Sequence, residues 1–228
     1  MTSHYDITTG AGRRTVPATD PTDPTYLRRA GLLCAAGGLI AVVGTCWGFF
    51  QAVPGADAVI SAPQSVTTFR LLELVWTLTH VLTFFGALGL ARSGLAGTTR
   101  AGRTGTRLAV VGMAALVPCE LAFIPFASST DSDTGPMVAS TVIGIASMIA
   151  GVGFVVAGIS TLRAGRWVGP ARLLPLLTGA WVFLVMTPLI IADGRLFYVG
   201  IGSWNLVLAL LGFALYRLGE KDVPLRHG

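Results

Sequence analysis

Six long apolar stretches constrain the fold of this chain more than any other feature of its sequence. Four of them carry no charged side chain: residues 30–56, 134–162, 173–192 and 196–216. The stretch 71–91 carries only Glu73, beside His80, and the stretch 108–130 carries only Glu120. A helix that crosses a bilayer needs about 20 predominantly apolar residues. The sequence therefore predicts an all-α, polytopic integral membrane protein with a bundle of six transmembrane helices, with spans near 30–53, 70–91, 107–127, 137–162, 171–192 and 197–217.

The scarcity of charge supports lipid rather than water as the main solvent. Only 12% of the 228 residues are charged, whereas a soluble domain carries about a quarter. We predict one transmembrane domain over residues 28–218. The polar, proline-containing segment 1–27 is predicted to be a disordered cytoplasmic tail, and residues 219–228 a short second cytoplasmic tail.

The positions of the basic residues predict the topology. Fourteen of the sixteen Lys and Arg residues fall in the two tails and in the second-to-third and fourth-to-fifth connections. Only Arg70 and Arg195 fall on the other side. By the positive-inside rule, both termini lie in the cytoplasm. Fifteen arginines against one lysine are typical of a GC-rich genome. The expected setting is the inner membrane of a bacterium, in a multi-pass arrangement.

The second stretch carries a polar stripe. Arg70, Glu73, Thr77 and His80 recur at helical spacing, so they share one face. Two structural interpretations compete with a functional one. Arg70 and Glu73 could form an interfacial ion pair, and His80 could make a hydrogen bond between helices, as polar side chains in membrane helices commonly do.

The third and sixth stretches add two polar side chains in the outer half of the predicted bundle. Glu120 lies between Pro118 and Pro125, each of which can kink a helix. An ionised carboxylate at this depth is costly, so Glu120 should be protonated, paired or turned to a wet cavity. We expect it to turn toward the Glu73–His80 face. Asn205 lies at a similar depth. The predicted ligand-binding residues are Glu73, Thr77, His80, Glu120 and Asn205, and the catalytic candidates are Glu120, Glu73 and His80.

Small residues predict where helices approach closely. Gly144, Gly151 and Gly158 recur at seven-residue steps and form a candidate seam, either within the bundle or at an oligomer contact. Gly44 and Gly48 form a small-xxx-small step that would admit another backbone. Homo- or hetero-oligomers through such faces are therefore an open alternative.

Three inward-ending segments share a pattern of a small residue, four others, Arg, one other and Gly: ALGLARSG, GISTLRAG and GFALYRLG. This pattern suggests three two-helix hairpin repeats. Helix ends that carry Arg and Gly for topology and capping would produce the same pattern.

Several chemistries have no motif in this sequence. The glycines are spread through apolar segments and form no phosphate-binding loop. The histidines and cysteines show no metal-ligand spacing, so no metal and no cofactor is predicted, and Cys34, Cys46 and Cys119 are interpreted as packing residues. The basic residues are explained by topology, so nucleic acid is not an expected partner, whereas the lipid bilayer is.

Four functions fit these residues. The first is a polar pocket in the outer half of the bundle that binds a small or lipid-like molecule. The second is an intramembrane acid–base enzyme acting on an isoprenoid or lipid, with Glu120 or Glu73 as general acid. The third is a non-catalytic partner subunit of a membrane complex, and the fourth is a proton-coupled transporter. Convergence of Glu73, His80 and Glu120 would favour the first two.

Overall fold

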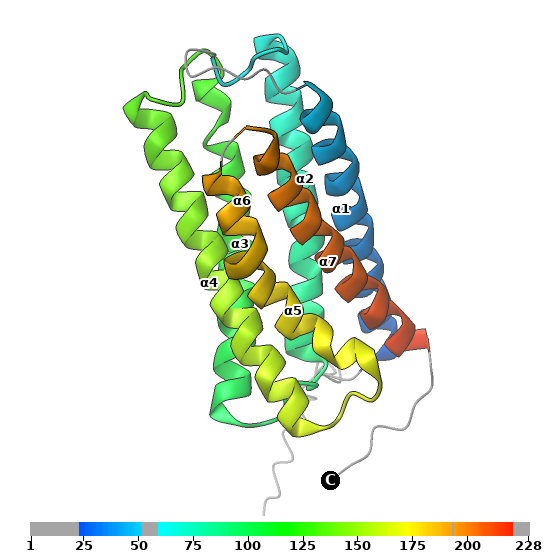
Figure 1. Ribbon diagram of the computed structural model, residues 1–228. Coiled ribbons are helices and arrows are strands. Elements are labelled where there is room, and N and C mark those ends of the chain that lie inside the picture. The colour runs from blue at the N-terminus through cyan, green and yellow to red at the C-terminus, as the bar shows by residue number, and fades with distance from the viewer. Residues whose placement is uncertain (1–22, 52–58, 193, 221–228) are drawn as a thin grey trace, which may run out of the picture.

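The protein is a bundle of long helices in a computed structural model that describes residues 23–51, 59–192 and 194–220 (Figure 1). Six helical segments are long and apolar enough to cross a membrane. Four of them are α1 (Pro24–Gln51), α2 (Val66–Arg92), α4 (Thr134–Ala164) and α7 (Arg195–Glu220). The part of the chain that is described contains no β-strand, only an isolated bridge between Val59 and Thr130. The predicted tails 1–27 and 219–228 lie mostly outside the described residues.

The other two segments are interrupted. The third consists of α3 (Arg100–Leu121) and a 3₁₀ turn, η1 (Ile124–Phe126), which contains Pro125. The fifth consists of η2 (Pro170–Leu173), α5 (Leu174–Trp181), a π-helical turn η3 (Val182–Met186) and α6 (Thr187–Ile191). Proline lacks the N–H that continues a helical ladder, which accounts for breaks beside Pro125 and Pro188.

Side-chain caps fix the start of two helices. The Ser65 hydroxyl accepts a hydrogen bond from the Thr68 N–H, and the Thr99 hydroxyl accepts one from the Gly102 N–H. Both satisfy a backbone donor that has no partner inside the helix. The Thr99 cap begins α3 seven residues before the predicted start at 107. The predicted connection between the spans 70–91 and 107–127 is therefore helical from Arg100, and the part of it before α3 buries Leu95 and Ala96.

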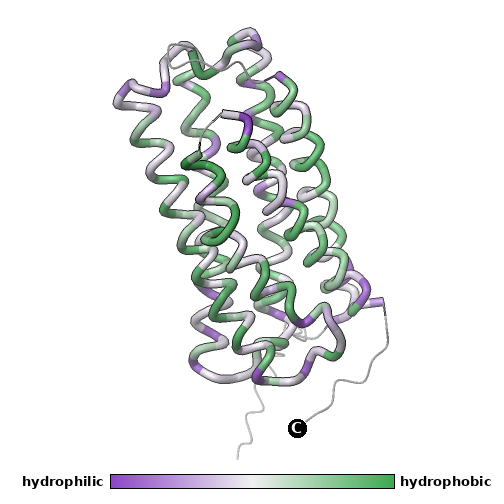
Figure 2. Tube along the Cα trace, in the orientation of Figure 1, coloured by the Kyte–Doolittle hydropathy of each residue, from purple (hydrophilic) through white to green (hydrophobic). Residues whose placement is uncertain are grey.

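Successive long segments run in alternating directions, so the two described chain ends lie at the same end of the bundle (Figure 1). Helix α1 packs along α7, α2 packs against α1 and α3, and α4 packs against α3 and α5. Hydrophobic residues dominate the length of the helices and hydrophilic ones gather toward the ends (Figure 2). We call the end that carries Arg92, Arg100 and Arg166 the arginine-rich end.

Close helix contacts depend on glycines that differ in part from those predicted. A Cβ on Gly153 would collide with the Ala109 backbone of α3, and one on Gly112 with the Ala150 backbone of α4. Gly158 of the predicted seam similarly meets the Leu176 backbone. Gly144 does not belong to that seam, because a Cβ there would meet nothing within 4 Å.

The prediction that Gly44 and Gly48 admit a backbone is also wrong. Both glycines receive aromatic side chains, Trp76 at Gly44 and Tyr198 at Gly48. The backbone contact of α1 is made instead by Gly31 and Gly38, which meet α7.

Candidate functional site

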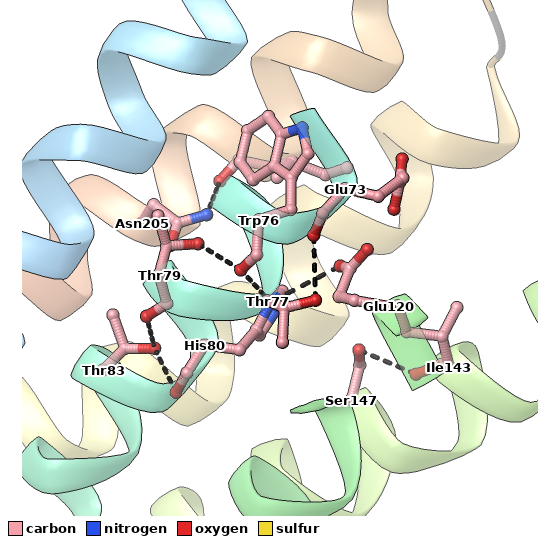
Figure 3. A network of polar contacts seen from close by, with 11 residues as sticks. Glu73, Trp76, Thr77, Thr79, His80, Thr83, Glu120, Ile143, Ser147 and Asn205 are labelled. Carbon is pink, nitrogen blue, oxygen red and sulfur yellow. Dashed lines mark hydrogen bonds and ion pairs between the residues drawn. The ribbon is translucent and has the colours of Figure 1, made fainter. Parts of the chain in front are cut away.

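Two neighbouring helices bring three of the predicted residues together. Glu73 and His80 project from α2 and Glu120 from the last turn of α3, and in Figure 3 the Glu73 and His80 side chains lie on the side of α2 that meets Glu120. His80 Nδ1 lies 3.4 Å from Glu120 Oε1. The expectation that Glu120 turns toward the polar stripe is confirmed. We call Glu73, His80 and Glu120 the carboxyl–imidazole cluster.

The cluster is largely shielded. The His80 and Glu120 side chains are 14% and 15% exposed, and Glu73 is 9% exposed. Leu74, the residue after Glu73 on α2, and Leu71, two residues before it, are among the exposed apolar side chains. The helix thus turns the Glu73 side chain inward and these two leucines outward.

A backbone carbonyl helps to orient the imidazole ring. His80 Nδ1 lies 3.1 Å from the Trp76 carbonyl oxygen, one helical turn earlier. A carbonyl only accepts hydrogen bonds, so this contact assigns the proton to Nδ1. The same nitrogen lies 3.4 Å from Glu120 Oε1. In neutral imidazole the other nitrogen, Nε2, is an acceptor.

The two carboxyl groups also lie near each other. The Glu73 and Glu120 side chains extend to the same side of α2 (Figure 3). Two ionised carboxylates are hydrogen-bond acceptors only, so neither can serve the other as a donor. Glu73 Oε2 is buried and no donor in the described part of the chain reaches it. Buried polar atoms are nearly always hydrogen-bonded. This oxygen therefore needs a hydrogen-bond donor that the described residues do not supply.

The structure does not support the proposed ion pair between Arg70 and Glu73. Arg70 is exposed and makes no ion pair with Glu73, which is turned inward instead. The interpretation of His80 as a simple interhelical hydrogen bond is too narrow, because the ring contacts both its own helix and an acidic side chain of α3.

The remaining predicted residues have other contacts. Thr77 lies on the same stripe, and its hydroxyl donates to the Glu73 carbonyl at 2.8 Å. Asn205 is buried where α7 meets α1, with its Nδ2 donating to the Ile201 carbonyl at 3.0 Å. No hydrogen bond or ion pair in the described residues joins Asn205 to the carboxyl–imidazole cluster. The structure thus unites three of the five predicted residues directly and Thr77 through the backbone.

Sequence reasoning missed two features near the cluster. Trp76, whose carbonyl orients His80, has no sequence signal, because any residue supplies a carbonyl. A separate groove of about 570 Å³ lies between α3 and α4 and is almost wholly apolar; it is lined by Pro118, Cys119, Ala122, Phe126, Thr134, Gly135, Val138, Ala139 and Val142. Glu120 does not line it.

The three cysteines take no part in the cluster and form no disulfide. Within residues 23–51, 59–192 and 194–220, no three His, Cys, Asp or Glu side chains are grouped in a way that could hold a metal ion. No protein-family model matches the chain, and no curated protein or solved structure is significantly similar to it.

Proposed function

We propose that this chain is a six-span integral membrane protein of the bacterial inner membrane with both termini in the cytoplasm. Six helices of sufficient length and apolarity support the number of spans. Ten arginines of the described residues lie in or next to the arginine-rich end: Arg28, Arg29, Arg92, Arg100, Arg103, Arg107, Arg163, Arg166, Arg172 and Arg217. This asymmetry supports a cytoplasmic location for that end.

The carboxyl–imidazole cluster is proposed to bind a small or lipid-like molecule in the outer half of the bundle. The observation that carries the proposal is the convergence of Glu73, His80 and Glu120, with Glu73 Oε2 buried and lacking a protein donor. Burying two acids against each other is unfavourable for folding unless they are paired. A bound molecule that pairs with them would explain why they are placed there.

Extraction of bound molecules from the purified protein tests this proposal. Wild-type protein, Glu73→Leu and Leu74→Ala are purified in a mild detergent, extracted and compared by mass spectrometry. Leu74 is the matched control, because it is the next residue on α2 and is 50% exposed. We expect a molecule that co-purifies with the wild type and Leu74→Ala but not with Glu73→Leu. The same extract from all three folded proteins would contradict a ligand site at the cluster.

The contact between His80 Nδ1 and Glu120 Oε1 favours one second candidate, an intramembrane acid–base enzyme acting on a lipid or isoprenoid. A carboxyl group and an imidazole within hydrogen-bond reach can pass a proton to and from a substrate. Cells that express Glu120→Gln instead of the wild type should then accumulate an unconverted lipid. Identical lipid profiles in the two strains would exclude catalysis on a membrane lipid.

A non-catalytic partner subunit gains no support from this geometry. Helix faces that only dock another protein give no reason for two acids and a histidine to meet inside the bundle. The convergence therefore favours binding or catalysis at the cluster over docking.

A further inference from the structure

The hydrogen-bond donors and acceptors around the cluster restrict the chemical class of its ligand. The hydroxyl protons nearby are already used within their own helices: Thr77 donates to the Glu73 carbonyl, Thr79 to the Trp76 carbonyl and Ser147 to the Ile143 carbonyl (Figure 3). His80 uses its Nδ1 proton at Trp76 and Glu120. What the cluster offers a ligand is therefore a set of acceptors: carboxyl oxygens and the imidazole Nε2.

An anionic head group would find no free hydrogen-bond donor among the described residues of this cluster. Phosphate and carboxylate groups are recognised by Arg, Lys or several N–H donors. No Arg or Lys makes an ion pair with Glu73 or Glu120 in the described residues, and Arg70, the nearest along α2, is exposed. An anion beside two acids would add repulsion in a site of low polarity.

A metal ion fits no better, because the described side chains offer no group of three suitable ligands. The unpartnered atom is an acceptor, Glu73 Oε2, on a residue that is nine-tenths buried. The missing group must therefore donate hydrogen bonds. A primary ammonium has three donors and a positive charge, and it complements both carboxyl groups.

We propose that the carboxyl–imidazole cluster binds the protonated primary amine of its ligand, with N–H groups donating to Glu73 and Glu120. This inference rests on the proposed ligand-binding function and names the chemical class of the molecule. The amine belongs either to a free amphipathic amine or to the head group of an aminophospholipid. Both sources present the same donor group.

Thermal unfolding with defined probes tests the amine assignment. Wild-type protein in phosphatidylcholine nanodiscs is heated with n-octylamine, octan-1-ol, octanoate or octyltrimethylammonium. We expect octylamine alone to raise the Tm, by about 5–10 °C at 100 times its Kd. Octyltrimethylammonium carries the charge without an N–H donor, so it separates hydrogen bonding from simple charge attraction. Glu73→Gln should lose the octylamine shift, and Leu74→Ala should keep it.

A second arm distinguishes the two sources of the amine. The same proteins are reconstituted with phosphatidylethanolamine in place of phosphatidylcholine. A higher wild-type Tm in phosphatidylethanolamine that is absent in Glu73→Gln identifies the lipid head group. An octylamine shift of equal size in both lipids identifies a free amine.

Two results would overturn the amine assignment. If octylamine stabilises the wild type no more than octanol does in either lipid, no ammonium binds at the cluster. If octanol or octanoate gives the Glu73-dependent shift and a molecule is still recovered by extraction, the site binds a ligand of another class. If no probe shifts the Tm and no molecule is extracted, the proposed function fails as well.

Discussion

Burial of the Glu120 carboxyl group is unfavourable for folding unless the group keeps its partners. This carboxyl group lies 3.4 Å from the His80 ring and near Glu73, while α3 carries no other charged side chain after Arg107. A buried group that loses one partner of this kind leaves the other partners unsatisfied, which costs about 1–3 kcal/mol. The size of that cost depends on whether the side chain that replaces Glu120 can still accept a hydrogen bond.

Replacing Glu120 should therefore have graded effects on stability. Glu120→Gln keeps the shape and an acceptor, so the free energy of unfolding should change by less than about 1 kcal/mol, while ligand binding or catalysis is lost. Glu120→Leu removes the partner of His80 and should destabilise the protein by about 1–3 kcal/mol. Both are measured by denaturant unfolding in mixed micelles. If Glu120→Leu is as stable as Glu120→Gln, His80 does not depend on this carboxyl group.

The residues of the cluster were predictable where helical spacing fixes direction. Glu73 and His80 share a face by their spacing, and a carboxyl group on the adjacent helix has a strong reason to turn toward them. Asn205 was placed by depth alone, and depth does not give the direction of a side chain around its helix. In the structure the backbone carbonyl of Asn205 packs against Gly38 of α1, and its side chain donates to the Ile201 carbonyl one turn earlier on α7.

At the scale of the helix, the position of each glycine decides whether two backbones can meet. Gly153 faces the backbone of Ala109 on α3, whereas Gly144 on the same helix α4 has nothing within 4 Å of an added Cβ. Small residues are what permits close approach between helices that have little hydrophobic drive to associate in lipid. The two glycines therefore form a matched pair within one element.

Alanine substitutions at this pair should separate packing from helix propensity. Gly153→Ala should destabilise the protein by about 1–3 kcal/mol, because the methyl group displaces the α3 backbone. Gly144→Ala should be neutral or stabilising by up to about 1 kcal/mol, because alanine is the better helix former. The measurement is denaturant unfolding of both variants beside the wild type. Equal effects would show that α3 and α4 do not meet at Gly153.

The ends of the elements were harder to predict than their existence. A hydropathy pattern marks only the apolar part of a helix. Helix α3 begins at Arg100, in an arginine-containing segment that precedes its apolar part. The opposite happens at Pro125, where a continuous apolar stretch does not stay α-helical. The burial of Leu95 in a short polar-looking connection depends on tertiary packing and has no local sequence signal.

At the scale of the whole molecule, alternating helix directions place ten of the twelve described arginines in or next to one end and the cluster nearer the other. Such an asymmetric bundle has one orientation that satisfies the positive-inside rule. The proposed topology would put the cluster in the outer half of the membrane. Ligands would reach it from the outer leaflet or the outer aqueous phase.

Reporter fusions should locate both faces. Fusions after Ser65, Asp131 and Gly194 should report an extracytoplasmic position, and fusions after Gly97, Arg166 and Gly228 a cytoplasmic one. Alkaline phosphatase and green fluorescent protein provide complementary readouts in cells. A single site of the reverse sense would break the six-span scheme with both termini in the cytoplasm.

The central claim is that the bundle assembles Glu120 and His80 into one site, and a double-mutant cycle measures this most directly. The free energies of unfolding are compared for the wild type, Glu120→Leu, His80→Leu and the double variant, with Glu120→Leu and Asn205→Ala as a control cycle. The 3.4 Å contact predicts a coupling energy of at least about 0.5 kcal/mol for the first cycle. The control cycle should be additive, because no hydrogen bond or ion pair among the described residues joins Asn205 to Glu120. Additivity in the first cycle would contradict the shared site.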